Sequence, residues 1–272
     1  MFPFWLSIGV LSLVQASLVA ASKPPLPALL GRLRSRWWAL VLPLSIVVVI
    51  SAIALDSASA RFLTYLALIA VPPLAAAALA WLVRGARWQL ALLVFPLFAL
   101  AWAAKGSLSG QTAALALSAL GCVTLGWLTA CVVPGRWLKL GIYVMAAVDA
   151  YLVGTDLLQA PNAVLNTASP VADLPRLQLA NFGSALMGFG DLYIAATLGA
   201  LLASDRRLQL RGAALAAVIG LTFDLLFFAI DELPATVPIA LTLLALELTS
   251  WRRDHATSAP TSGSRRRNLR SR

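Results

Sequence analysis

The chain has 272 residues, of which 60% are hydrophobic and only 12% are charged. An average soluble domain carries about 25% charged residues, so this composition excludes a water-soluble globule and indicates a membrane protein. The net charge of +10 does not indicate a nucleic-acid partner, because the basic residues lie between apolar segments, where they set the orientation in the lipid bilayer.

Cysteine and histidine are scarce. Cys122 and Cys131 both lie inside apolar runs, and His255 is the single histidine. This content excludes a disulfide-stapled secreted fold and the cysteine-rich or histidine-rich patterns that bind zinc. We therefore expect neither a metal nor an organic cofactor.

The apolar runs predict an all-α integral membrane protein. A spanning helix needs about 20 mainly apolar residues, and unpaired backbone groups in hydrocarbon make helices the favoured structure. The first run is interpreted as a span and not a signal peptide, because no basic residue precedes it and it is long for a signal-peptide core. The nine predicted spans cover about residues 2–21, 37–55, 62–83, 88–104, 112–133, 139–158, 180–203, 212–230 and 236–250.

Basic residues alternate between the loops that join these spans. Eighteen Lys and Arg residues follow the odd-numbered spans or lie in the tail, and three lie on the opposite side. The positive-inside rule then places the N-terminus outside and the C-terminus in the cytoplasm. Residues 252–272 are rich in Arg, Ser and Thr, and we expect a disordered basic tail that contacts anionic lipid or, alternatively, binds a partner. Ala- and Leu-rich spans with more Arg than Lys favour a prokaryotic plasma membrane.

Three aspartates, Asp149, Asp191 and Asp224, lie within predicted spans. An acid at mid-membrane costs about 2.5–3.5 kcal/mol on insertion scales, so each is a functional candidate. Asp149 is about the eleventh residue of span six and Asp191 about the twelfth of span seven. At about 1.5 Å per residue, both lie roughly 15–17 Å deep in a core about 30 Å thick. Two consecutive antiparallel helices would therefore bring two carboxyl groups to one level.

A facing pair of carboxyl groups cannot hold two negative charges, so one member keeps a proton while the other is a base. Aspartic-protease chemistry requires this arrangement. The ionised member takes a proton from a water that attacks the peptide carbonyl, and the protonated member hydrogen-bonds the carbonyl oxygen.

Two further motifs surround these acids. Gly188 and Gly190 flank Phe189 directly before Asp191, where glycine allows another backbone to approach closely and the helix to loosen. Pro234, Ala235 and Thr236 precede the ninth span, whose first turn should enter as irregular backbone that lines a cavity and pairs with an extended substrate. An ordinary helix start with proline in the first turn explains the second motif equally well.

The order of these motifs resembles the GxGD-type intramembrane aspartyl proteases, the presenilin and signal peptide peptidase family. The resemblance covers nine spans, an Asp in span six (Asp149), Gly-Phe-Gly-Asp in span seven (188–191) and a Pro-Ala-Leu-like element before span nine (234–236). It implies that Asp149 and Asp191 are the catalytic pair, that Gly188 and Gly190 shape the cleft, and that the third element positions the active site and substrate.

The chain departs from the family pattern at three places. Val148 stands where an aromatic residue commonly precedes the first Asp, and the third motif reads Pro-Ala-Thr instead of Pro-Ala-Leu. The loop of about 159–179 is short, without the long autocleaved insert of presenilins. Its outside placement resembles signal peptide peptidase, which implies substrate helices with a cytoplasmic N-terminus.

Other readings remain open. Asp156 is interpreted as an interfacial residue, whereas Asp224 is a rival that could join the pair or bond a hydroxyl across the bundle. The leading hypothesis is an intramembrane aspartyl endopeptidase that cleaves transmembrane helices of other proteins. The alternatives are a proton-coupled transporter or channel and an inactive scaffold that binds transmembrane helices. The sequence indicates no oligomeric state.

Overall fold

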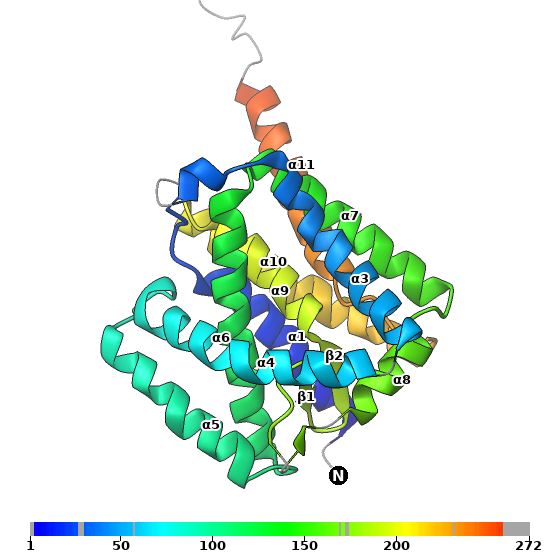
Figure 1. The fold of residues 1–272 in the computed structure, drawn as a ribbon. Coiled ribbons are helices and arrows are strands. Elements are labelled where there is room, and N and C mark those ends of the chain that lie inside the picture. Colours follow the sequence, from blue (N-terminus) through cyan, green and yellow to red (C-terminus); the bar gives the residue numbers. More distant parts are fainter. Residues whose placement is uncertain are drawn as a thin grey trace, which may run out of the picture.

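A computed structural model describes residues 3–26, 30–56, 58–168, 170–171, 174–230 and 232–257 (Figure 1). The described chain is mostly helical, with one small antiparallel hairpin. The helices are α1 (Phe4–Ala21), α3 (Val41–Leu55), α4 (Ala58–Ala77), α5 (Val94–Ala103), α6 (Leu108–Val132), α7 (Gly135–Gly154), α8 (Gln159–Thr167), α9 (Phe189–Leu202), α10 (Arg206–Asp224) and α11 (Val237–Thr257), and the strands are β1 (Leu179–Phe182) and β2 (Ala185–Gly188).

Several helices are lengthened by turns of different pitch. The 3₁₀ segments Arg36–Leu40 and Trp88–Leu93 precede α3 and α5, and Leu225–Phe228 follows α10. The π-helical turn Ala78–Leu82 extends α4. With these extensions, six of the described helices are long and apolar enough to cross a membrane: Phe4–Ala21, Arg36–Leu55, Ala58–Leu82, Leu108–Val132, Gly135–Gly154 and Arg206–Phe228.

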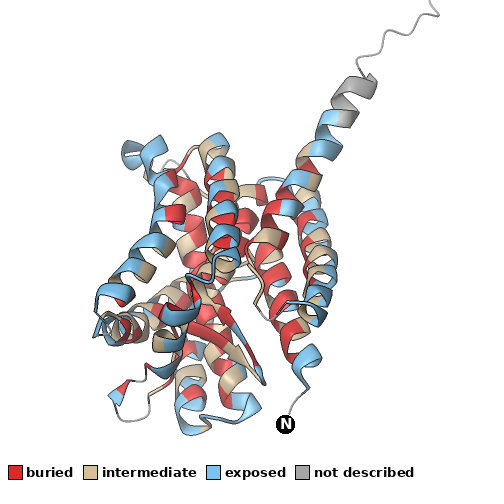
Figure 2. Ribbon diagram, turned by 90° about the vertical axis from the view of Figure 1, so that its right-hand side faces the viewer, coloured by how far each residue is buried: buried red, intermediate tan, exposed pale blue. Residues whose placement is uncertain are grey.

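These six helices are compatible with the predicted multi-pass character and coincide with six of the nine predicted spans; the nine-span bundle is not confirmed. The other three apolar segments, Trp88–Ala103, Phe189–Leu202 and Val237–Trp251, form shorter helices. Many large apolar residues of the other helices are exposed on the bundle surface, whereas α9 is mostly buried. Figure 2 shows the buried residues gathered inside the bundle. Apolar surface on the outside is what a lipid-facing bundle requires, because lipid tails are as apolar as leucine.

The prediction of one continuous helix over 180–203 is wrong for the first third of that segment. Leu179–Phe182 pairs with Ala185–Gly188 as a hairpin, and α9 begins only at Phe189. Gly183 has a φ of 62° in the two-residue turn, a conformation that glycine adopts without steric cost. Asp191 is therefore the third residue of α9 and not the twelfth of a long helix.

Two further boundaries differ from the sequence prediction. The loop after α7 contains a short helix, α8, which the sequence did not indicate. The last helix, α11, continues to Thr257, although the tail was predicted to begin at 252. The remainder of the tail, 258–272, lies outside the described residues.

Two helices organise the interior. α6 is the most buried of the six long helices and packs along α9, while α1 packs against α9 and α10. A Cβ added at Gly126 of α6 would lie 2.6 Å from the backbone N of Thr197, and one added at Gly199 would lie 2.6 Å from the carbonyl O of Leu18. Glycine at these positions lets the backbones of α6, α9 and α1 approach more closely than any side chain would permit.

A polar cluster ties the ends of α1 and α9 to the start of α10. Gln209, fully buried, donates from Nε2 to the carbonyls of Ser22 and Gly199, and Arg84 donates to Gln209 Oε1 and to the carbonyl of Ala203. Burial and the nearby charge of Arg206 lower the pKa of Arg84. The cluster satisfies carbonyls at helix ends that have no partner within their own helices.

Candidate functional site

Asp149 lies near the C-terminal end of α7, with only 5% of its surface exposed. Its Oδ2 accepts a hydrogen bond of 2.6 Å from the hydroxyl of Thr236 and one of 3.4 Å from the backbone N–H of the same residue. Thr236 is fully buried and directly precedes α11. A buried carboxyl group needs such donors, because leaving it without them would be costly.

Asp191 lies in the first turn of α9, where its Oδ2 accepts a hydrogen bond of 3.0 Å from the backbone N–H of Gly188. A carboxylate at a helix N-terminus is stabilised by unpaired amides and by the helix dipole. A Cβ at Gly188 would stand 3.0 Å from this same oxygen, so any side chain there would press on the carboxyl group. Asp191 is half-buried, whereas Asp149 is buried.

The structure brings the two acids near each other. α7 packs against α9, the helix whose first turn carries Asp191. Met145, one turn before Asp149, has its methyl group 3.7 Å from the place where a Cβ at Gly190 would stand. The Gly-Phe-Gly-Asp turn therefore lies against the part of α7 that carries the other acid.

The Pro-Ala-Thr element completes this arrangement. Residues 232–234 have no regular secondary structure, and Ala235 and Thr236 form a turn, so the backbone enters α11 irregularly as predicted. α11 then begins at Val237 with Pro238 in its first turn, which is also the ordinary helix start that was the alternative. The irregular entry thus applies to residues 232–236, and the ordinary helix start applies to the first turn of α11.

A cavity of about 530 Å³ opens at the C-terminal end of α7, and neither Asp149 nor Asp191 is among its lining residues. Its lining includes Ala150, next to Asp149, and Pro234 of the Pro-Ala-Thr element, together with Asp156 and Glu232. It lies between the end of α7, the turn after α10 and the segment that leads into α11. The cavity therefore adjoins the first residue of the third motif and the residue that follows Asp149.

Phe189, the rival acid Asp224 and the interfacial acid Asp156 have their own partners. The carbonyl of Phe189 accepts from the Cys122 thiol of α6 at 3.6 Å. Asp224, at the end of α10, accepts a hydrogen bond of 2.8 Å from the hydroxyl of Ser12 on α1. Asp156, exposed and with a φ of 57°, accepts from Gln159 at 3.0 Å. Of the two alternatives for Asp224, the structure shows the bond to a hydroxyl across the bundle, that of Ser12.

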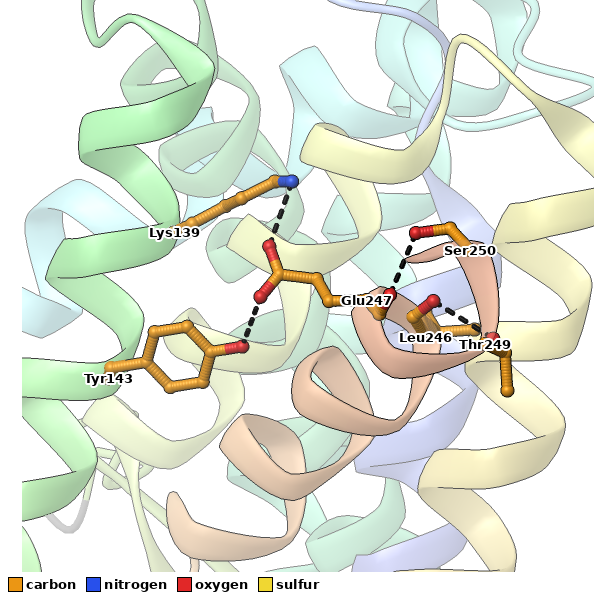
Figure 3. A network of polar contacts seen from close by, with 6 residues as sticks. All are labelled: Lys139, Tyr143, Leu246, Glu247, Thr249 and Ser250. Atoms are coloured by element: carbon orange, nitrogen blue, oxygen red, sulfur yellow. Dashed lines mark hydrogen bonds and ion pairs between the residues drawn. The ribbon is translucent and has the colours of Figure 1, made fainter. Parts of the chain in front are cut away.

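Two polar groups were missed at the level of sequence, one at the site and one between α7 and α11. Gln15 of α1, 3% exposed, donates from Nε2 to the carbonyls of Asp191 at 3.1 Å and Ala235 at 2.9 Å. Glu247 of α11 accepts from the Tyr143 hydroxyl at 2.7 Å and pairs with Lys139 at 2.9 Å, both on α7 (Figure 3). Each is a polar side chain within an apolar run, and that position is the signal that could have revealed it.

No protein-family model, curated protein or solved structure matches this chain. Among the described residues, no group of three or more His, Cys, Asp or Glu side chains is arranged to hold a metal ion.

Proposed function

We propose that the protein is an intramembrane aspartyl endopeptidase that hydrolyses peptide bonds within transmembrane segments of other proteins, with Asp149 and Asp191 as the catalytic pair. The observation that carries the proposal is the packing of the two acid-bearing segments: α7 packs against α9, and the methyl group of Met145 on α7 lies 3.7 Å from the place where a Cβ at Gly190, next to Asp191, would stand. Burying two acids together is unfavourable for folding, and such pairs in a membrane usually have a functional reason.

The hydrogen bonds suggest how the pair would work. Those found for the two carboxyl groups in the described part of the chain end on the Oδ2 atoms, from Thr236 to Asp149 and from Gly188 to Asp191. The Oδ1 atoms would then be the ones that contact a water molecule and the substrate carbonyl. The ionised acid accepts the proton of the attacking water, while the protonated acid hydrogen-bonds the carbonyl oxygen as negative charge develops there.

Collapse of the tetrahedral intermediate completes the reaction. The C–N bond breaks, the amine leaving group takes a proton from the acid that received it from water, and a new carboxyl group remains on the other product. Atoms and protons balance with water as the single co-substrate. Because the two acids exchange one proton, any titration of activity belongs to the pair and not to either residue.

A substrate helix must unwind before its amide can reach the pair. Two non-helical segments adjoin the acids, the hairpin β1–β2 directly before α9 and residues 232–236 directly before α11. Either can offer backbone donors and acceptors to an extended strand, and the cavity of about 530 Å³ adjoins the second of them. Together with the predicted orientation, this arrangement favours substrates whose transmembrane helix has a cytoplasmic N-terminus, taken from the plasma membrane of a prokaryote.

The proposal is tested by the cleavage of a model single-span substrate by the purified protein in detergent micelles. Asp149→Asn and Asp191→Asn should each abolish cleavage, because each removes one of the two roles. Asp224→Asn is the matched control: it removes an acid within a candidate spanning helix, one that bonds Ser12, and should leave the rate within about twofold.

Wild-type rates in both Asn variants would overturn the assignment. Substrate capture by the wild-type protein without any products would indicate a helix-binding scaffold. Loss of cleavage in Asp224→Asn, together with pH-coupled flux in vesicles, would favour a transporter in which all three acids carry protons.

A further inference from the structure

Gln15 connects the two motifs that carry the proposed active site. Its side-chain nitrogen donates to the carbonyl of Asp191 at 3.1 Å and to the carbonyl of Ala235 at 2.9 Å. These two acceptors fix the orientation of the Gln15 side-chain amide, because the flipped amide would place its own oxygen against two carbonyl oxygens. One buried side chain on α1 therefore bonds the backbone of the Gly-Phe-Gly-Asp turn and that of the Pro-Ala-Thr element.

The second of these bonds leads directly to Asp149. The carbonyl of Ala235 and the N–H of Thr236 belong to the same peptide group, and that N–H lies 3.4 Å from Asp149 Oδ2. A trans peptide is planar, with its carbonyl and N–H pointing in opposite directions. With Gln15 holding the oxygen, the N–H and the neighbouring Thr236 hydroxyl are aimed at the Asp149 carboxyl group, to which the hydroxyl donates at 2.6 Å.

The same amide also restrains the other acid. Asp191 supplies its backbone carbonyl to Gln15, while its carboxyl group is bound by Gly188. Gln15 is thus connected to both acids, through the backbone on one side and through a single peptide group on the other. Its two hydrogen bonds restrict how far the first turn of α9 and the segment before α11 can move relative to each other.

We infer that Gln15 is a positioning residue that sets the relative orientation of the Asp149 and Asp191 carboxyl groups for peptide hydrolysis. This inference rests on the proposed function. Gln15 does not contact either carboxyl group, so it acts through the backbone of Asp191 and through the Ala235–Thr236 peptide. Its loss should reduce kcat and leave KM largely unchanged, because the change falls on the reacting geometry and not on the substrate-binding surface.

A graded series of variants tests this role. Gln15→Met keeps the size of the side chain and removes both donors, and Gln15→Glu keeps the shape with at most one donor. We expect kcat to fall in the order wild type, Gln15→Glu, Gln15→Met, with a loss of about 10- to 100-fold in the last, as misplacement of catalytic groups by about 1 Å produces. Ser12→Ala is the matched control on the same helix face of α1, since it removes a buried side-chain donor whose bond goes to Asp224.

A double variant separates positioning from general damage. If Gln15 acts through the Ala235–Thr236 peptide, then Gln15→Met combined with Thr236→Val should lose little more activity than the worse single variant. Independent structural defects would instead multiply. All rates are normalised to the folded fraction measured by size exclusion and thermal unfolding in the same detergent.

Each outcome has a defined meaning. A kcat within about twofold of wild type in Gln15→Met, or a loss that disappears after normalisation to folded protein, overturns the positioning role while Asp149→Asn still abolishes cleavage. Multiplying losses in the double variant overturn it as well. Full activity in Asp149→Asn would instead remove the proposed function on which the role depends.

Discussion

The hydroxyl of Thr236 offers the most direct test of how the Asp149 carboxyl group is held. Thr236→Val removes the 2.6 Å hydrogen bond to Asp149 Oδ2 and keeps the size of the side chain in a fully buried position. The longer bond from the backbone N–H, 3.4 Å, remains. A hydrogen bond to a charged group contributes about 1.5–3 kcal/mol. If that contribution is made in the transition state, kcat falls by about 10- to 150-fold.

The assay is cleavage of a single-span substrate at saturation, with unfolding in detergent measured in parallel. Thr236→Ser restores the hydroxyl and should recover most of the activity. Thr242→Val, within the helix that follows Thr236, is the control: Thr242 is also fully buried, but its hydroxyl donates at 2.8 Å to the carbonyl of Pro238 within α11. Undiminished kcat in Thr236→Val, or an equal loss in Thr242→Val, would refute the idea that this hydroxyl orients Asp149.

Three further predictions concern stability, each measured by unfolding in mixed detergent micelles. Gly199→Ala places a Cβ 2.6 Å from the backbone of α1 and should lower the free energy of unfolding by about 1–3 kcal/mol. Gly154→Ala is the control, because no atom of another segment lies within 4 Å of the added Cβ, and it should lower the stability less. Equal losses would contradict the close-packing argument. Gly183→Ala forces a side chain into a turn with a φ of 62° and should cost about 1–2 kcal/mol, with no loss expected if the hairpin does not form. Glu247→Gln removes the ion pair with Lys139; because the Lys139 side chain is 42% exposed and that of Glu247 35%, the stability should fall by at most about 1 kcal/mol. This loss should shrink at high salt. A salt-independent loss would assign the effect to the Tyr143 hydrogen bond instead.

The apolar segments could be located from sequence because hydropathy over about 20 residues measures the free energy of transferring a helix from water into the membrane. Six of the nine predicted spans are confirmed as helices of sufficient length and apolarity. Hydropathy does not give the helix boundaries, since helix ends depend on capping and on 3₁₀ turns such as Arg36–Leu40. α8 is short, and its nine residues contain too few apolar side chains for the sequence to predict a helix.

The hairpin before α9 could not be found by hydropathy, because a buried strand and a buried helix are equally apolar. Local signals existed in Asn181, Gly183 and Gly188, which are poor helix formers, and in the Gly-Ser pair at the turn. What decides the outcome is tertiary: the N–H of Gly183 donates to Gln111 Oε1 on α6, and the N–H of Ser184 donates to the Ser7 hydroxyl on α1. Non-helical backbone is tolerated inside a membrane protein only where such partners exist.

The proposed site was partly accessible from sequence for a similar reason. Asp149, Asp191 and Thr236 belong to motifs whose residue types are unusual within apolar runs, so they could be singled out one by one. The role of Gln15 could not, because it depends on which backbone carbonyls lie beside α1 in the folded chain. Glu247 is an intermediate case: an acid within an apolar run was visible, but its partners on α7 were not.

These contacts change the interpretation of the first helix. By sequence, α1 is an apolar span interrupted by a few small polar residues, and such residues commonly mark nothing more than helix packing. In the folded chain, Ser7 bonds the hairpin turn, Ser12 bonds Asp224, and Gln15 bonds the backbone on both sides of the proposed catalytic pair. A helix that carried only a topology signal would gain nothing from burying three polar side chains, since each must be dehydrated. Their cost is offset by bonds to segments that come together only in the folded state, so α1 acts as the internal support on which the hairpin, α9 and the start of α11 are aligned.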